Sequence, residues 1–463
     1  MPHRLDRLDW PDFGAPDVPA PVSESRMRHR LFALRDAVRA ADLDCLVIYG
    51  DREHAANIHW ATGFDPRFEE ALLILPSEGR PVLAAGNECL PYTRLAPLVA
   101  AGEIDVAHCP GLSLISQPRD VGERIDAVLR RHVPAGARVG TAGWKYWEPG
   151  EVDDPAHAVE IPALLADVLR GRARGGVVRN ATDLLMHPGY GLRSVVAADD
   201  IARLEFANAM AARAVRRILS SLRVGMTDFE AVEAGRVGGL PLGCHVTFAT
   251  GAMAAQGLSG PSGQRIALGN PLSFNICHWG ANVCRSGWLA RDEADLPSAA
   301  RGYVASFAGP YVEAMSLWLS MMRPGVSGGD VWAAMASALP RGIFGVTLNP
   351  GHLIGLDEWI SSPIFEGSTL PLRSGMAMQC DIIPAHPVFG SVRMEDGYVI
   401  AGPALRADLH DRFPDVAGRC AARRSFMRER LGFDVPECLL PLADTCGIVP
   451  PFLLAPDRVV LPA

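Results

Sequence analysis

The segment LSFNICHWG, residues 272–280, places three chemically active side chains inside an apolar stretch. Asn275 carries an amide that donates and accepts hydrogen bonds, Cys277 a thiol that can act as a nucleophile, and His278 an imidazole that transfers protons near neutral pH. Successive residues of a strand point to opposite faces. We therefore expect Asn275 and Cys277 to face a site and His278 to be structural.

Two carboxylates lie in later segments that also read as buried strands. Asp381 is in GMAMQCDIIP (residues 375–384) and Glu395 is in SVRMEDGYVI (residues 391–400). A carboxylate inside a sheet is costly unless it is paired, hydrogen-bonded or bound to metal. The pattern predicts that both carboxylates gather with Asn275 around one site.

The elements that must position these residues fall into two domains. A length of 463 residues also favours two domains over one. Residues 1–180 alternate amphipathic helices with short β-branched strands, which is typical of an α/β domain. A connection rich in Gly, Pro and Asn then leads to a second domain, which we predict to span residues 181–463.

The second domain contains an internal repeat. LSSLRVGMTDFEAVEA, from Leu219, and LSMMRPGVSGGDVWAAM, from Leu319, share the end of a long helix, a glycine turn, a capping Thr or Ser and a second helix. Strand-like segments follow each copy. This predicts two helix–helix–strand units related by a pseudo-two-fold axis.

Composition excludes several classes of protein. The formal net charge of -8 and a pI near 5.9 provide no basic face for nucleic acid or an anionic membrane. The sequence has neither the order of a secretory signal nor an apolar run of membrane-spanning length, so we expect a cytoplasmic protein. Ten cysteines occur without a CxxC pair, which argues against a zinc knuckle or a redox motif.

The motifs NPGHLIGLDEW, LRSGMAMQCDIIP and SVRMEDGYVI, together with the repeat, resemble the C-terminal domain of the creatinase, prolidase, aminopeptidase P and methionine aminopeptidase family. The N-terminal half resembles the creatinase-type N-terminal domain. The resemblance implies an α/β (α+β) fold: a creatinase-type α/β domain followed by a "pita-bread" domain with a pseudo-two-fold internal repeat.

Metal-dependent members of this family use two aspartates, one histidine and two glutamates as ligands. Carried over by position, the histidine is His352, and the glutamate positions hold Asp381 and Glu395. The first aspartate position holds Asn275. The second holds Ser286 by ungapped counting, or Cys284 if a short deletion is allowed.

Neutral side chains at both aspartate positions remove two of the four carboxylates that would offset the charge of two cations. We therefore expect no metal ligands and no cofactor. A single divalent ion on His352, Asp381 and Glu395 is the alternative.

These residues, with the resemblance to metal-free creatinase, predict a metal-independent hydrolase that cleaves a C–N bond in a small amide or amidine. His352 would be the acid/base, Asp381 and Glu395 would orient it or position water, and Asn275 would bind the substrate. Cys277 and Trp359 are further substrate-binding candidates. Trp359 stands where the family has a second site histidine, and creatinase's catalytic histidine aligns near Ser259.

Histidines elsewhere could replace the missing ones, and His245 and His278 are the candidates. Two other functions fit the same fold. One is a metal-dependent Xaa-Pro aminopeptidase, dipeptidase or lyase, and the other is a catalytically silent homologue that binds a small molecule.

Creatinase-like dimers close each site with a loop from the other subunit's N-terminal domain. Arg67 and Phe68 lie close to the loop positions that contact a substrate carboxylate, so we expect a homodimer of this kind. The apolar C-terminal tail, after about residue 402, would cover either its own domain or a dimer surface.

Overall fold

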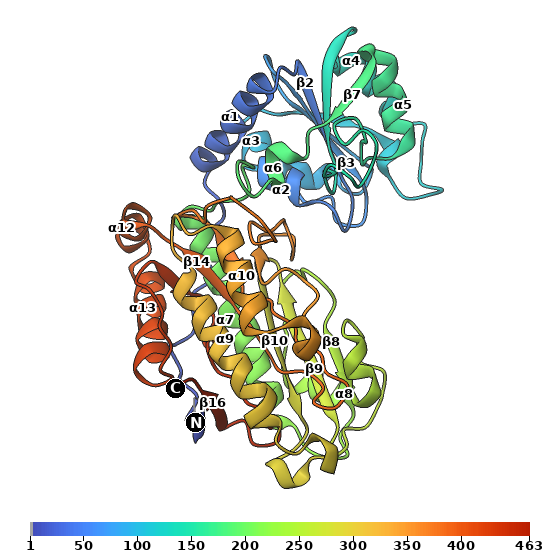
Figure 1. The fold of residues 1–463 in the computed structure, drawn as a ribbon. Coiled ribbons are helices and arrows are strands. Elements are labelled where there is room, and N and C mark those ends of the chain that lie inside the picture. Colours follow the sequence, from blue (N-terminus) through green and yellow to red (C-terminus); the bar gives the residue numbers. More distant parts are fainter. Residues whose placement is uncertain (1–2) are drawn as a thin grey trace. The chain divides into compact units, whose positions relative to one another are not determined.

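The structure is a computed structural model that describes residues 3–463, apart from the side chains of residues 255 and 256. The chain forms two compact units, which are described separately (Figure 1). One unit spans residues 20–194, and the other combines residues 1–19 with residues 195–463. No helix of the described chain combines the length and the apolar character that crossing a membrane requires.

The unit of residues 20–194 is built on a mixed six-stranded sheet with the order β5-β4-β3-β2-β6-β7. Its strands are β2 (Cys45–Gly50), β3 (Ala71–Pro76), β4 (Val82–Ala85), β5 (Asp105–His108), β6 (Ala137–Ala142) and β7 (Ala173–Asn180). Its helices are α1 (Glu24–Ala40), α2 (Ala56–Thr62), α3 (Pro97–Ala100), α4 (Ile125–His132), α5 (Ala163–Arg172) and α6 (Asp183–Met186), with short 3-10 turns η1 (Leu90–Leu95) and η2 (Pro110–Leu112).

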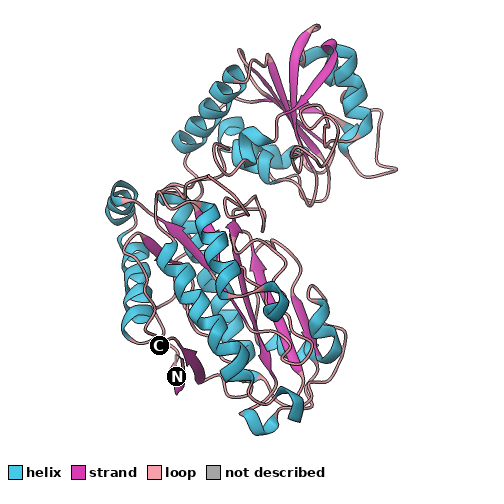
Figure 2. Ribbon diagram, in the orientation of Figure 1, coloured by secondary structure: helices cyan, strands magenta, loops and turns pink. Residues whose placement is uncertain are grey.

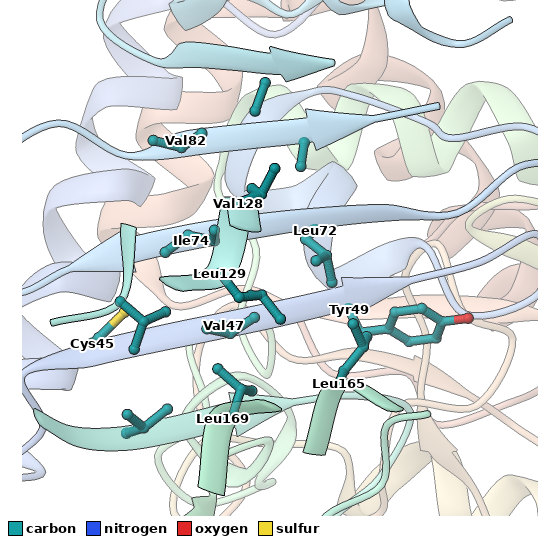
Figure 3. Close-up of a cluster of buried hydrophobic side chains, with 14 of the residues drawn as sticks. Cys45, Val47, Tyr49, Leu72, Ile74, Val82, Val128, Leu129, Leu165 and Leu169 are labelled. Carbon is teal, nitrogen blue, oxygen red and sulfur yellow. The ribbon is translucent and has the colours of Figure 1, made fainter. Parts of the chain in front are cut away.

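The core of this unit lies between the sheet and helices α4 and α5. Val47 and Ile74, from central strands, pack with Val128 of α4 and with Leu165 and Leu169 of α5 (Figure 3). All five side chains are almost fully buried. The alternation of apolar residues that predicted an α/β domain is thus realised as an apolar sheet face covered by helices.

The second unit contains two four-stranded sheets, ordered β13-β10-β9-β8 and β11-β12-β14-β15. The strands are β8 (Thr247–Thr250), β9 (Pro271–His278), β10 (Ala281–Trp288), β11 (His352–Leu353), β12 (Ala377–Gln379), β13 (Arg393–Glu395), β14 (Gly397–Ile400) and β15 (Leu439–Pro441), and a separate pair joins β1 (Arg4–Arg7) to β16 (Arg458–Leu461).

Helices lie beside these sheets (Figure 2). They are α7 (Ala198–Ser221), α8 (Asp228–Ala234), α9 (Gly309–Met321), α10 (Gly328–Ala338), α11 (Arg341–Phe344), α12 (Pro403–Arg412) and α13 (Pro414–Glu429), with the short turns η3 (Gly251–Gln256), η4 (Glu293–Asp295), η5 (Ser298–Ala300) and the π-helical η6 (Val304–Ala308).

The predicted repeat is present. Helices α7 and α8 form the first copy, and α9 and α10 form the second. The turn between the helices contains Gly225 in one copy and Gly325 in the other, each with φ +90°, a conformation that favours glycine. Thr227 caps α8 and Ser327 caps α10 through side-chain oxygens. The shared sequence pattern therefore encodes a shared turn and cap.

The unit boundaries differ from the predicted domains, 1–180 and 181–463. Residues 181–194 stay with the first unit, where Ala181 N donates to Thr141 O at 2.7 Å and Arg193 donates to Asn57. Residues 1–19 belong to the second unit, since β1 pairs with β16. Composition did not reveal this pairing because it joins the two ends of the chain.

The C-terminal tail covers its own unit. Strand β15 extends the sheet beside β14, and Trp288 of β10 forms a bridge with Phe452. Ile448, Val449 and Phe452 are fully buried. The apolar tail therefore covers its own domain, which is one of the two roles expected for it.

A buried ion pair anchors this tail to the strands of the site. Arg285 of β10 is fully buried and lies 2.9 Å from Asp396, and it also donates to the carbonyl oxygens of Thr445 and Ile448. Loss of one partner of a buried pair leaves an uncompensated charge. We expect Arg285→Met to lower the free energy of unfolding by about 3–5 kcal/mol, measured by urea denaturation.

The matched control is Arg291→Met, because the Arg291 side chain is 64% exposed and pairs with Asp295 at 2.9 Å. Exposed pairs are screened by water and contribute little. Equal urea midpoints for the Arg285 and Arg291 variants would contradict the anchoring role of Arg285.

Candidate active site

The first sheet lines up polar residues on one face. Across its strands, Thr247, Asn275, Cys284 and Glu395 lie directly opposite one another in a row. The next row on the same face ends in Arg393. Cys284, and not Ser286, is therefore the residue opposite Asn275.

The hairpin between β9 and β10 sets this register. Gly280 forms its turn with φ +87°, and Asn208 of α7 donates to the Gly280 carbonyl oxygen at 2.9 Å. Helix α7 packs across both strands. The helix of the first repeat thus fixes the turn that places Asn275 beside Cys284.

The second sheet supplies the histidine and the other carboxylate. His352 of β11 pairs with Gln379 of β12, and Asp381 follows two residues after that strand. Gln379 Nε2 donates to Asn282 O of β10 at 2.9 Å, which links the two sheets at the site. Gly351 precedes the histidine with φ +107°, and a Cβ there would lie 2.8 Å from Gln379 O. The close approach requires glycine.

His352 is completely buried and its ring stacks on Trp359, with ring centroids 4.1 Å apart. Its Nδ1 lies 3.2 Å from the Leu353 carbonyl oxygen, which can only accept, so Nδ1 carries a hydrogen. Nε2 lies 3.5 Å from Glu358 Oε1 and 3.9 Å from Asp381 Oδ2, yet it has no hydrogen-bond partner among the described residues. Nε2 is therefore the ring atom free for proton transfer.

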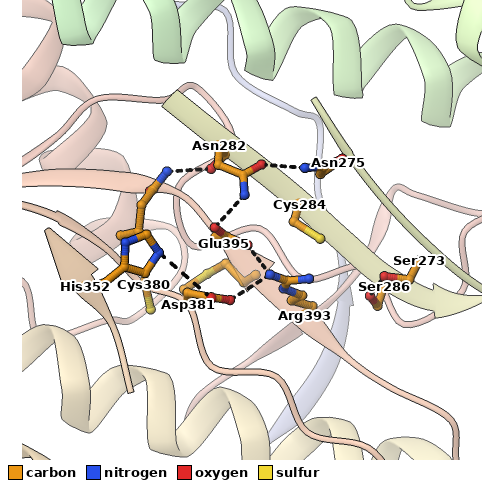
Figure 4. Close-up of polar contacts among 12 residues, drawn as sticks. Ser273, Asn275, Asn282, Cys284, Ser286, His352, Cys380, Asp381, Arg393 and Glu395 are labelled. Carbon is orange, nitrogen blue, oxygen red and sulfur yellow. Dashed lines mark hydrogen bonds and ion pairs between the residues drawn. The ribbon is translucent and has the colours of Figure 1, made fainter. Parts of the chain in front are cut away.

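The guanidinium of Arg393 lies between the two carboxylates (Figure 4). Its Nη2 is 2.7 Å from Asp381 Oδ1 and also donates to Glu395 Oε2. Glu395 is fully buried and Asp381 nearly so. A buried carboxylate pair needs a counter-ion, and a side chain of the protein provides it here.

The electrostatics follow from this arrangement. Burial would lower the pKa of the Arg393 guanidinium, but Cys284, Glu395 and Asp381 together hold that pKa well above its usual range. Burial raises the pKa of the Glu395 carboxyl well above its usual range, with Arg393 opposing and Asp381 adding to the rise. The site favours a charged Arg393 and a Glu395 that resists ionisation.

Asn275 is held entirely by protein groups. Its Oδ1 accepts from Thr247 N at 2.8 Å and from Thr247 Oγ1 at 2.7 Å. Its Nδ2 donates to Asn282 Oδ1 at 2.9 Å and to Cys244 Sγ at 3.4 Å. All its donors and acceptors are thus engaged, which favours a positioning role, while the substrate contact stays a prediction.

Asn282 extends this network towards the carboxylates. Its Nδ2 donates to Glu395 Oε1 at 2.9 Å and to Glu358 Oε1 at 3.1 Å. The Glu358 side chain is 25% exposed, more than that of Asp381 or Glu395, so it is the most accessible carboxylate of the three. A chain of amides therefore runs from Thr247 to the acidic centre.

The other predicted residues occupy distinct places. Cys277 is fully buried, and a hydrogen bond to Cys244, with burial, raises its pKa well above the usual range. His278 is buried, and burial lowers its pKa. His245 Nε2 is 2.6 Å from the Leu258 carbonyl oxygen. Trp359 contacts His352 directly. The substrate contacts of Cys277 and Trp359 stay predictions.

Arg67 and Phe68 lie in the unit of residues 20–194. Arg67 adopts φ +58°, pairs with Asp65 at 3.4 Å and lies over the Tyr92 ring at 5.7 Å. Phe68 is 50% exposed. Their exposure leaves both side chains accessible, and the closure of a partner's site by this loop stays a prediction.

Sequence reasoning missed four residues of the site: Arg393, Asn282, Glu358 and Cys244. Arg393 had a readable signal, because it precedes Glu395 by two residues on the same strand and so shares its face. Glu358 precedes Trp359 in the motif NPGHLIGLDEW. For Cys244, which lies outside the strands, the sequence carried no comparable signal.

The donors gathered here do not fit a pair of metal ions. His352, Asp381 and Glu395 each offer an atom within 4.8 Å of the others, so three ligands for one ion are close together. However, Arg393 Nη2 contacts both carboxylates, and Asn275 and Cys284 are neutral. A cation between Asp381 and Glu395 would meet the positive guanidinium.

Comparison with known proteins gives fold neighbours only. No family model and no curated protein matches the chain. Among solved structures, dipeptidase PepE from Mycobacterium ulcerans has a TM-score of 0.60 and 22% identity, covering 82% of this chain and 95% of that one. The prolidase from Pyrococcus horikoshii OT3 has a TM-score of 0.61 and 14% identity, covering 81% and 95%.

A variant of aminopeptidase P from Escherichia coli is also similar, with a TM-score of 0.53 and 15% identity over 82% of this chain and 94% of that chain. The predicted fold class is confirmed by these neighbours, whose similarity extends over most of the chain. The protein therefore has the α/β pita-bread fold that prolidases, Xaa-Pro dipeptidases and aminopeptidase P share.

Proposed function

We propose that the protein is a hydrolase that cleaves a C–N bond of a small amide or amidine and works without a pair of metal ions. The dipeptidase and prolidase neighbours are named for reactions that cleave such bonds, which supports the reaction class. The observation that carries the metal-independent part is the Arg393 guanidinium bound to both Asp381 and Glu395.

In this proposal His352 is the acid/base. Its Nδ1 is held by a backbone carbonyl, and its ring orientation is fixed by Trp359, so Nε2 faces the site in one orientation. Preorganisation of this kind is what proton transfer requires. Asp381 lies 3.9 Å from Nε2 and would favour the imidazolium that forms after the proton is taken.

Arg393 and Asn282 hold the acidic centre in place. Asn282 Nδ2 bridges Glu395 and Glu358, while Arg393 bridges Glu395 and Asp381. Each carboxylate is therefore fixed by a donor that belongs to the protein. The geometry needs no further cation to hold these side chains together.

A second candidate is a peptidase or lyase that binds one divalent ion. The specific observation that favours it is the gathering of His352, Asp381 and Glu395 within 4.8 Å. In that case Arg393 must leave the carboxylates before an ion can bind. Metal affinity would then depend on the residue at position 393.

Arg393→Met separates the two candidates. Without the guanidinium, two buried carboxylates face each other unpaired, so we expect the free energy of unfolding to fall by about 3–5 kcal/mol. Excess Mn²⁺ should then raise the melting temperature of the variant, because the three ligands are released, and leave the wild type unchanged. Differential scanning fluorimetry measures both effects.

The control is Arg323→Met, since Arg323 is half exposed and pairs with Asp434 at 3.7 Å. It should behave as wild type with and without Mn²⁺. Wild-type protein purified without chelator that contains close to one ion per chain, by elemental analysis, would contradict the metal-independent proposal.

His352→Gln tests the acid/base role. Removal of a positioned acid/base costs roughly 10²–10⁴-fold in rate. We expect a loss of this size in kcat for any small amide or amidine that the wild type hydrolyses, detected as amine release by NMR. His410→Gln, an exposed change on α12, should leave the rate unaltered. Undiminished turnover by the His352 variant would exclude this role.

A further inference from the structure

A short segment before β8 runs beside the end of β9 and carries Cys244. Gly243 N donates to Cys277 O at 3.2 Å, and Leu242 forms an isolated bridge with His278. A Cβ at Gly243 would lie 2.8 Å from Cys277 Sγ, so the segment passes directly over that thiol. These contacts fix Cys244 at the edge of the site, where it is half-buried.

The amide of Asn275 points a donor at Cys244. Thr247 N can only donate, so the Asn275 atom that faces it at 2.8 Å is the oxygen. Nδ2 is therefore directed the other way, to Cys244 Sγ at 3.4 Å and to Asn282 Oδ1. An amide at this position can stabilise a thiolate, whereas an aspartate would repel it.

The surroundings of Cys244 act on its ionisation in both directions. The hydrogen bond from Cys277 and the bond from Asn275 lower the pKa of the Cys244 thiol to about 7, with His245 adding to the fall, while burial and Glu358 oppose it. Among the ten cysteines, all within the described part of the chain, the other nine have pKa values raised by burial or by neighbouring groups.

A second group at the site lacks a partner. His352 Nε2 is fully buried and forms no hydrogen bond within the described residues, and it lies 3.5 Å from Glu358 Oε1. The same Glu358 oxygen accepts from Asn282, which in turn accepts from Asn275 beside Cys244. Hydrogen bonds thus run from Cys244 through Asn275 and Asn282 to Glu358, and they end 3.5 Å from the free imidazole nitrogen.

We propose that Cys244 is the nucleophile of the C–N bond cleavage, with His352 as the proton carrier. This inference rests on the proposed function. The Cys244 thiolate forms a bond from Sγ to the amide or amidine carbon. The C–N bond then breaks, and the leaving nitrogen takes a proton from the His352 imidazolium. Water attacks the resulting thioester or its imino analogue and gives a proton to His352, and Sγ leaves as the thiolate.

Alkylation tests the nucleophile without any substrate. The rate at which iodoacetamide labels Cys244 should rise with pH and reach half its maximum near pH 7. At pH 7 iodoacetamide should label Cys244 roughly tenfold faster than it labels Cys438. Cys438 is the matched control because it is also half-buried but has a raised pKa. Peptide mapping by mass spectrometry identifies the labelled residue.

Charge and hydrogen bonding give two further expectations. Iodoacetate should label Cys244 more slowly than iodoacetamide, because Glu358 and the acidic centre repel an anion. Asn275→Asp and Cys277→Ala should each lower the Cys244 rate at pH 7 by about tenfold, since each removes a donor to the thiolate. The two variants are independent, so a folding defect in one leaves the other informative.

Labelling of Cys244 with a midpoint near pH 9, or no faster than that of Cys438, would overturn the proposal. With a hydrolysed amide or amidine in hand, Cys244→Ser should lose at least about 100-fold in kcat, and acid quenching of wild type should trap an adduct on Cys244. If Cys244→Ser keeps full turnover while His352→Gln is inactive, Cys244 is not the nucleophile, but the proposed hydrolase function still stands. Undiminished turnover by both variants would remove the proposed mechanism as a whole.

Discussion

The site depends on one guanidinium placed between two buried carboxylates. Arg393 contacts Asp381 and Glu395 at once through its Nη2 atom, so one terminal nitrogen of the guanidinium donates to both carboxylates. Because the counter-ion is a side chain of the same strand as Glu395, its position is set by the register of β13. It cannot dissociate from the protein as a free ion can.

With Arg393 as the counter-ion, neutral residues are favoured at the neighbouring positions 275 and 284. One guanidinium can offset only one negative charge fully, so further carboxylates at positions 275 and 284 would be left unpaired in a buried setting. Asn275 and Cys284 fill these places without adding charge. The amide also supplies a donor, which an aspartate does not, and that donor reaches Cys244.

The two faces of the same strands carry separate ion pairs. Glu395 and Arg393 point to the site, while the neighbouring Asp396 pairs with Arg285 on the opposite face. Since alternate residues of a strand face opposite ways, the strand can be fixed from both sides at once. The tail contributes carbonyl oxygens to Arg285, so the C-terminal extension supports the acidic centre from behind.

Much of this fold could be predicted from local patterns. The repeat was visible because its turn glycines and capping residues are local signals, and Asn275, Asp381 and Glu395 were visible as polar residues in apolar strands. Arg393 was missed although it lies in the motif SVRMEDGYVI, because its partner Asp381 lies in a different segment, two residues after β12. The pairing of Asn275 with Cys284 depends on the length of the turn at Gly280, which the spacing of residues in the sequence does not give.

The pairing of β1 with β16 brings residues 4–7 together with residues 458–461. The unit that carries the site therefore begins at the first strand of the chain and is completed by the last, with the other unit inserted between its two parts. During synthesis the inserted unit is complete once residue 194 has been made and can fold while synthesis continues. Strand β1 can find its partner only after residues 458–461 have been made, so the two ends of the site-bearing unit join long after its first strand has left the ribosome.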